Sequence, residues 1–100
     1  MVSVYDIRMK MNQNMDLKQV CLKLKEAYDT HSKVRYVLDT RGGEISMENM
    51  KRFKSVFDKF ESRAKEKLVE TVILVDGGFK KMLMKSYIKI FNSDDKIRII

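Results

Sequence analysis

One short segment, Val69–Val75, restricts the possible folds of this chain more than any other. Its sequence, VETVILV, is a nearly continuous apolar run rich in β-branched residues, which is typical of a strand. Successive residues of a strand point to opposite faces of the sheet, so we expect other elements to cover both faces here. Runs of this kind are typical of parallel sheets. The segment therefore predicts a central, parallel strand.

The rest of the chain alternates between strand-like and helix-like segments. β-Branched and aromatic residues predict further strands over Val2–Met9, Val34–Leu38 and Lys96–Ile100. Apolar residues spaced by three and four predict helices from Asp16 to about Tyr28, from Ser46 to about Leu68, and from about Phe79 to Phe91. The order β-α-β-α-β-α-β requires crossover connections. We predict one α/β domain, residues 1–100, with a mainly parallel four-stranded sheet.

The counts of cysteine and histidine exclude several kinds of site. The chain has one of each, Cys21 and His31, which excludes an internal disulfide and a multi-histidine or multi-cysteine metal site. Cys21 falls on the apolar stripe of the first helix and is interpreted as a core residue. His31 lies in a polar loop without a neighbouring acid or nucleophile. We therefore predict no catalytic residue, no metal and no cofactor.

Two further features bear on where the protein acts. The sequence has no run of about 18 apolar residues, so no membrane-spanning helix is expected. Its first residues lack the basic segment and following apolar segment of a secretory signal. A single cysteine also suits a reducing compartment. Together these features predict a cytoplasmic protein.

The net charge of +7 is concentrated in the second half of the chain. Residues 1–50 carry 8 basic and 7 acidic side chains, whereas residues 51–100 carry 13 basic and 7 acidic ones. A basic balance favours acidic partners, such as nucleic acid, anionic lipid or an acidic protein surface. Nucleic acid is the weaker prediction, because Glu48, Asp58, Glu61 and Glu66 are interspersed among the lysines and no aromatic-rich binding motif is present.

Two predicted strand ends carry similar turns that could form a ligand crevice. Open α/β sheets bind ligands at the carboxyl ends of their strands. Carboxylates there could hold Mg²⁺, and glycine backbone N–H groups could contact a phosphate. Asp and Gly are also the ordinary residues of tight turns, which is the interpretation we favour. The residues concerned are Asp39, Arg41, Gly42, Gly43, Asp76, Gly77 and Gly78.

The predicted helix 79–91 carries two apolar stripes instead of one. At 100° per residue, one face holds Phe79, Met82, Leu83, Ser86, Tyr87 and Ile90. The second stripe lies roughly 130° around the helix and holds Met84, Ile88 and Phe91, next to Lys81, Lys85 and Lys89. One stripe is enough to dock a helix on a sheet. We expect the first stripe to face the core, and the second to be covered by a neighbouring element or to form a lysine-rimmed interface.

The order of elements resembles a STAS-type domain, the fold of anti-sigma-factor antagonists, which is itself similar to the core of CRAL-TRIO lipid-transfer domains. The resemblance covers about Asp16 to Ile100 and depends on two segments. These are Tyr36–Thr40, followed by a turn and a long helix, and the strand Val69–Val75. It implies a non-enzymatic domain that binds partners and is regulated by phosphorylation of a Ser or Thr at the start of that helix.

Ser46 is the residue that could take the place of this phosphoacceptor. The family motif resembles Asp-Ser-Ser-Gly, and its Asp and Gly are absent from the region around Ser46. Ser46 is also well placed to cap the helix, because its hydroxyl can accept a hydrogen bond from a free backbone N–H of the first turn. We therefore interpret Ser46 first as a helix cap.

These observations lead to three functional hypotheses. The first is a non-catalytic protein-interaction module, which binds another protein or a second copy of itself through helix 79–91. The second is a domain that binds lipid or an anionic membrane surface, as the lysine-rimmed stripe and the lipid-transfer resemblance suggest. The third is a nucleic-acid-binding domain that uses the basic second half of the chain.

Overall fold

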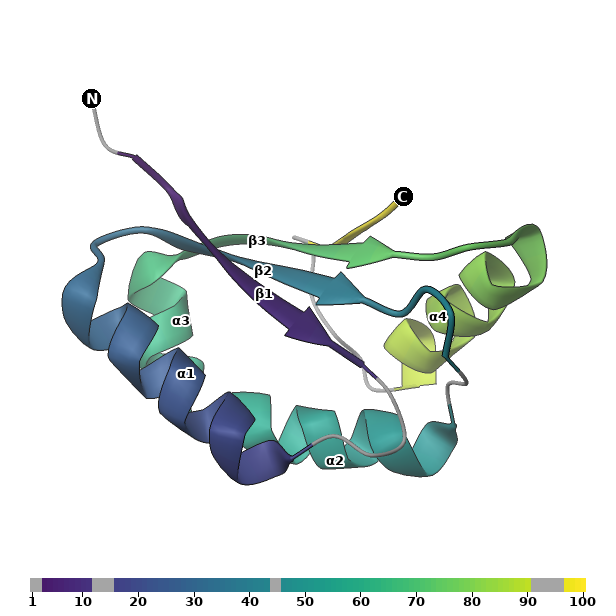
Figure 1. The fold of residues 1–100 in the computed structure, drawn as a ribbon, viewed down its shortest axis with the longest axis horizontal. Coiled ribbons are helices and arrows are strands. Elements are labelled where there is room, and N and C mark those ends of the chain that lie inside the picture. Colours follow the sequence, from purple (N-terminus) through teal and green to yellow (C-terminus); the bar gives the residue numbers. More distant parts are fainter. Residues whose placement is uncertain (1–2, 12–15, 44–45, 91–96) are drawn as a thin grey trace.

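A computed structural model describes residues 3–11, 16–43, 46–90 and 97–100 (Figure 1). The strands are β1 (Tyr5–Lys10), β2 (Val34–Asp39), β3 (Leu68–Leu74) and β4 (Ile97–Ile99). The helices are α1 (Leu17–Thr30), α2 (Met47–Asp58), α3 (Glu61–Lys67) and α4 (Gly78–Ile90). The predicted order of strands and helices is confirmed except that the second predicted helix is split into α2 and α3, and most boundaries shift by a few residues. Phe91 lies outside the described residues, and the side chain of Lys89 is not described either.

The four strands form one parallel sheet in the order β1-β2-β3-β4, which confirms the predicted fold class. Each connection therefore moves one strand further in the same direction. Because crossover connections are almost always right-handed, successive crossovers in one direction place their helices on the same face. Figure 1 shows this arrangement, with the helices below the sheet.

The expectation that β3 is covered on both faces is wrong. Within the described ranges, the helices pack on one face of the sheet only (Figure 1). The apolar run of β3 still alternates between the two faces. Ile73 belongs to the hydrophobic core, whereas Val72 is buried without belonging to it. Leu74 is half-buried and also lies outside that core.

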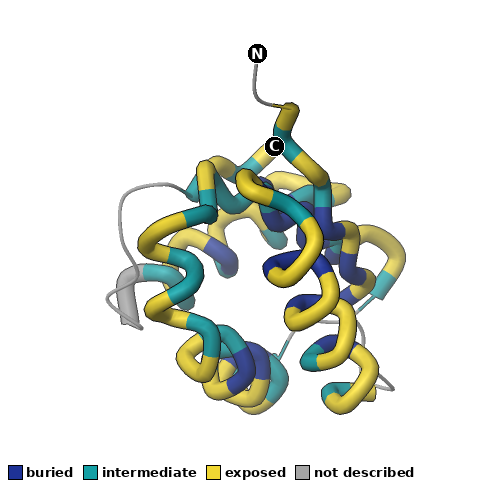
Figure 2. The backbone as a smooth tube through the Cα atoms, turned by 90° about the vertical axis from the view of Figure 1, so that its left-hand side faces the viewer, coloured by how far each residue is buried: buried dark blue, intermediate teal, exposed yellow. Residues whose placement is uncertain are grey.

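The core fills the space between the sheet and the helices, where Figure 2 shows the buried segments in dark blue. Leu24 and Tyr28 reach it from α1, Phe53 from α2, and Ile7 from β1. Asp16 begins α1 as predicted, because its carboxylate accepts a hydrogen bond from the Lys18 N–H at 3.0 Å. Helix packing on an apolar sheet face supplies most of the stability of such short helices.

The predicted helix Ser46–Leu68 is two helices, with a break at Lys59 and Phe60. The backbone N–H of Phe60 bonds to the carbonyl of Phe57 at 3.0 Å, which tightens the chain there. The Phe60 ring stacks on Tyr28 with 5.9 Å between centroids. Beyond the break, Lys67 Nζ donates to the carbonyl of Tyr28 at 2.6 Å. The break thus lets α3 follow the end of α1 instead of continuing along α2.

Candidate functional site

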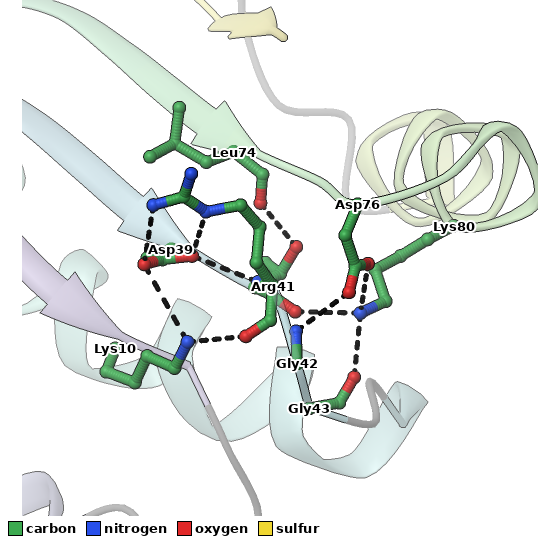
Figure 3. Close-up of polar contacts among 9 residues, drawn as sticks. Lys10, Asp39, Arg41, Gly42, Gly43, Leu74, Asp76 and Lys80 are labelled. Atoms are coloured by element: carbon green, nitrogen blue, oxygen red, sulfur yellow. Dashed lines mark hydrogen bonds and ion pairs between the residues drawn. The ribbon is translucent and has the colours of Figure 1, made fainter.

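Five of the predicted crevice residues lie together at the carboxyl ends of β2 and β3, namely Asp39, Arg41, Gly42, Gly43 and Asp76 (Figure 3). Gly77 lies in the turn before α4, and Gly78 is the first residue of that helix. Asp39 is the last residue of β2, and Asp76 follows β3 in the turn before α4. Parallel pairing of the two strands brings both turns to the same edge of the sheet. The two carboxylates have different partners there.

Two cationic side chains contact the carboxylate of Asp39. One is Arg41, which follows β2, and the other is Lys10 at the end of β1. Arg41 donates to it three times, from Nε at 3.0 Å, from a guanidinium NH₂ at 3.2 Å and from its backbone N–H at 3.0 Å. Lys10 Nζ lies 3.7 Å from the second carboxylate oxygen. The Arg41 hydrogen bonds hold the pKa of Asp39 well below its usual range.

Asp76 belongs to a second network, which joins the loop after β2 to the turn after β3. It accepts from the backbone N–H of Gly42 at 2.8 Å and lies 2.7 Å from Lys80 Nζ. Lys80 also donates to the carbonyls of Thr40 and Gly43, each at 2.8 Å. The Lys80 contact lowers the pKa of Asp76. We call the residues Thr40, Gly42, Gly43, Asp76 and Lys80 the loop clasp.

The clasp favours the turn interpretation of these residues. Each carboxylate is engaged by its own cation, and the described residues contain no cluster of three metal-ligating side chains. Gly42 adopts φ 74°, a backbone conformation that glycine tolerates without strain. Its N–H is committed to Asp76, so it is not directed at a ligand. Ligand binding in this crevice stays a prediction, and the geometry supports a structural role.

Sequence reasoning missed two members of the clasp, Thr40 and Lys80. Thr40 is fully buried, and its hydroxyl donates to the carbonyl of Leu74 at 2.6 Å. Lys80 is only 18% exposed although it is a lysine. The spacing of Asp76 and Lys80, four residues apart across a helix start, is the signal that predicts their ion pair. The bonds to Thr40 and Gly43 depend on tertiary structure.

The assignment of the two stripes on α4 is wrong for most of their described residues, although Tyr87 of the first stripe does pack against the core as expected. Met84, expected on the interface, is fully buried in the core, and Ile88 packs against that core. Phe79 and Met82, expected in the core, are 73% and 62% exposed. Both stripes satisfy helical periodicity, and the helix is rotated so that the second one meets the sheet. Phe91 of the predicted interface lies outside the described residues.

The remaining predictions on α4 and α2 have mixed outcomes. Lys81 and Lys85 are exposed, and they now flank Phe79 and Met82 instead of Met84. Ser46 is the N-cap of α2, as predicted, since its hydroxyl accepts from the Asn49 N–H at 3.1 Å. Among the described residues, no helix is long and apolar enough to cross a bilayer.

The second face of the sheet was not identified from the sequence. We call it the uncovered face, since no helix of the described ranges packs on it. One row runs across all four strands in register, from Arg8 through Val37 and Val72 to Arg98. Leu74 and Ile100 extend the apolar centre towards the carboxyl end of the strands. Alternation along the strands places five further residues on the uncovered face, namely Asp6, Lys10, Arg35, Asp39 and Glu70.

Ion pairs link all the strands across this face. Arg35 Nε lies 3.2 Å from Asp6 on β1, and its NH1 lies 3.3 Å from Glu70 on β3. Glu70 also accepts from Arg98 on β4 at 3.1 Å. Val37 and Val72 are buried although no helix of the described ranges packs on them, and the long arginine side chains beside them account for this burial.

Comparison of this chain with protein families, with curated proteins and with solved structures finds no match in any of the three.

Proposed function

We propose that this protein is a non-catalytic protein-interaction module and that a partner protein binds its uncovered face. One observation carries the proposal, namely that one face of an all-parallel sheet has no helix on it within the described part of the chain. All-parallel sheets occur almost only with both faces covered. Val37 and Val72 are already buried on this face, so the apolar surface that a partner could reach is that of Ile100 and part of Leu74, bordered by charges. A partner that covers this surface would complete the usual two-sided burial.

The charge distribution favours a partner surface that carries carboxylates. Arg98 is 58% exposed, whereas Glu70, with which it pairs, is only 28% exposed. Arg41 is likewise more exposed than Asp39, with which it pairs at the other end of the face. In these two pairs the cationic group projects further than the acidic one, whereas in the Arg35–Asp6 pair Asp6 is slightly the more exposed, at 38% against 32%. A carboxylate-bearing partner would meet cations at the rim and apolar side chains at the centre.

Nucleic acid and membrane surfaces fit this face less well than a protein does. The face carries no aromatic side chain on which a base could stack. A bilayer is contacted through apolar side chains that enter it, and the exposed apolar surface of this face is limited to Ile100 and part of Leu74. Arginine at the border of a small apolar centre is common in protein interfaces. The resemblance to STAS-type domains implies the same class of function.

The exposed pair Phe79 and Met82 on α4 is a second candidate surface for the same function. Their side chains lie one helical turn apart and are flanked by Lys81 and Lys85. This pair forms a smaller surface than the uncovered face. It belongs to one element, α4, whereas the uncovered face spans four strands. It is therefore the natural competitor in an experiment that locates the binding surface.

Paired charge reversals test the proposal. A cell extract is passed over the immobilised wild type, over Arg8→Glu/Arg98→Glu on the uncovered face, and over Lys51→Glu/Arg52→Glu on α2 as a control with the same charge change. We expect a protein that the wild type and control retain and the first variant loses. That protein is then purified and titrated into isotope-labelled wild type, where amide shifts should map to the strands.

Three outcomes would overturn the proposal. Loss of binding in Phe79→Ser/Met82→Ser, with retention in Arg8→Glu/Arg98→Glu, would place the site on α4. Amide shifts confined to the loop clasp would place it at the strand ends. Shifts of the strand amides by a single-stranded oligonucleotide or by phosphatidylserine vesicles, without any protein partner, would change the partner class.

A further inference from the structure

β1 is an edge strand with a long unpaired side. Among the described residues it pairs with β2 alone, and at six residues it is twice as long as the opposite edge strand, β4. The N–H groups of Tyr5 and Met11 point to β2, where they bond to the carbonyls of Lys33 and Asp39. The backbone groups of the alternate residues, Asp6, Arg8 and Lys10, therefore point away from the sheet. An edge of this kind is a template for another strand.

A groove runs beside this edge, between β1 and the flank of α1. Its volume is about 550 Å³, and Arg8, Met9 and Lys10 form its β1 wall. Leu22 and Lys23 line it from α1, and Leu22 is 66% exposed. Lys23 Nζ donates to the outward-facing carbonyl of Arg8. The edge is therefore accessible from the groove except at the carbonyl of Arg8, which Lys23 contacts.

We propose that β1 pairs with β1 of a second copy of this chain, antiparallel and around a two-fold axis. The two four-stranded sheets would then form one continuous sheet of eight strands. An interface around a two-fold axis uses the same patch twice, so the patch must be complementary to itself. The charges of β1 meet this requirement in one register.

The register follows from which residues of the second copy lie opposite the outward-facing residues Asp6 and Arg8. Pairing Asp6 with Asp6 of the second copy places like charges opposite each other, and so does pairing Arg8 with Arg8. The register centred on Ile7 places each Asp6 opposite Arg8 of the second copy. Opposite charges directly across an antiparallel pair stabilise it, and like charges destabilise it. The geometry therefore selects the Ile7-centred register.

Lys23 has a defined role in this assembly. In the proposed register, the carbonyl of Arg8 accepts from the N–H of Asp6 of the second copy, and Lys23 Nζ already occupies one of the two lone pairs of this oxygen and stands at the edge. Lys23 then competes with dimerisation. Replacing it by methionine removes the competing donor and should tighten the dimer. The proposal is independent of the function proposed above, although a dimer would join two uncovered faces into one surface.

Charge-swapped variants test the dimer in sedimentation experiments from about 5 µM to about 500 µM, a range that covers weak and moderate affinities. We expect the wild type to form dimers within this range. Asp6→Arg and Arg8→Asp should each be monomeric, because each places like charges across the interface. An equimolar mixture of the two should restore a dimer, since every opposed pair is again opposite in charge. Lys23→Met should dimerise at several-fold lower concentration than the wild type.

Matched controls keep the experiment interpretable. Glu66→Arg on α3 and Arg52→Asp on α2 change charge by the same amounts at exposed positions away from β1, and both should dimerise like the wild type. Circular dichroism confirms that each variant folds. A wild type that stays monomeric at the highest concentration would overturn the proposal. A dimer that persists in both single variants, or a mixture that stays monomeric, would also overturn it.

Discussion

The two faces of the sheet bury their apolar residues in different ways. On the covered face, Ile7, Tyr36, Leu38 and Ile73 pack against the helices in a continuous core. On the uncovered face, Val37 and Val72 lie between Arg8 and Arg98 and are shielded by charged side chains linked in ion pairs. The apolar run of β3 contributes residues to both faces. A continuous apolar run in a parallel strand therefore does not require a helix on each side.

The difference has energetic consequences. Removing a side chain from the covered face leaves a cavity among tightly packed neighbours, which costs transfer free energy and lost contacts. Removing one from the uncovered face allows arginine stems and water to fill the space. We therefore expect substitutions of similar size to differ strongly between the faces, and the following experiments measure that difference.

The largest contrast is expected between two methionines of α4. Met84 is fully buried in the covered-face core, and Met82 is exposed two residues away. Met84→Ala should lower the free energy of unfolding by about 2–5 kcal/mol. Met82→Ala should change it by less than about 0.5 kcal/mol. Urea unfolding of both variants checks this, and equal losses would mean that α4 is rotated differently.

Adjacent residues of β3 compare the faces directly. Ile73 is 2% exposed on the covered side, and Leu74 is half-buried on the uncovered side. Ile73→Ala should cost about 2–5 kcal/mol. Leu74→Ala should cost about 1 kcal/mol, because less apolar surface is lost from burial. Chemical denaturation measures both, and a larger cost at Leu74 would indicate that the uncovered face is covered in solution.

The loop clasp should contribute a moderate amount. Lys80→Met removes the donor of three contacts and leaves the carbonyls of Thr40 and Gly43 without it. We expect a loss of about 1–3 kcal/mol in unfolding free energy. Lys85→Met, an exposed change on the same helix, is the control and should be nearly neutral. If Lys80→Met proves as neutral as the control, the clasp is not stabilising.

The last contrast is confined to alkaline pH and comes from the buried tyrosine pair of the covered face. Burial raises the pKa of Tyr36 far above its ordinary value of 10.0, and its hydrogen bond with Tyr28 raises it further. The stability that this shift contributes is fully present below pH 10 and is lost as the pH rises beyond it. Tyr36→Phe should therefore flatten the alkaline loss of stability.

Thermal unfolding between pH 8 and pH 12 measures this effect. Ultraviolet titration should also show that Tyr28 and Tyr36 ionise late, since burial raises the pKa of Tyr28 as well. Ionisation of all four tyrosines in one step near pH 10 would contradict the prediction.

Much of the fold could be predicted from local pattern. The alternation of strands and helices, the Asp16 and Ser46 caps and the crevice at the strand ends all depend on near neighbours or on general rules of parallel sheets. The break at Phe60 could not be predicted in this way, because it depends on stacking against Tyr28 from another helix. The role of Lys80 likewise depends on carbonyls of Thr40 and Gly43, far away in the sequence.

By itself, the sequence determined that the chain is an α/β domain with a parallel sheet, and that α4 has two apolar stripes. The tertiary structure decided which stripe of α4 faces inward and which face of the sheet the helices cover. A helix with two apolar stripes has two rotational settings of similar local quality, and only packing against the strands selects one. An alternation of strands and helices is likewise compatible with several strand orders. The order β1-β2-β3-β4 is what places the helices on one face and leaves the other to charged side chains.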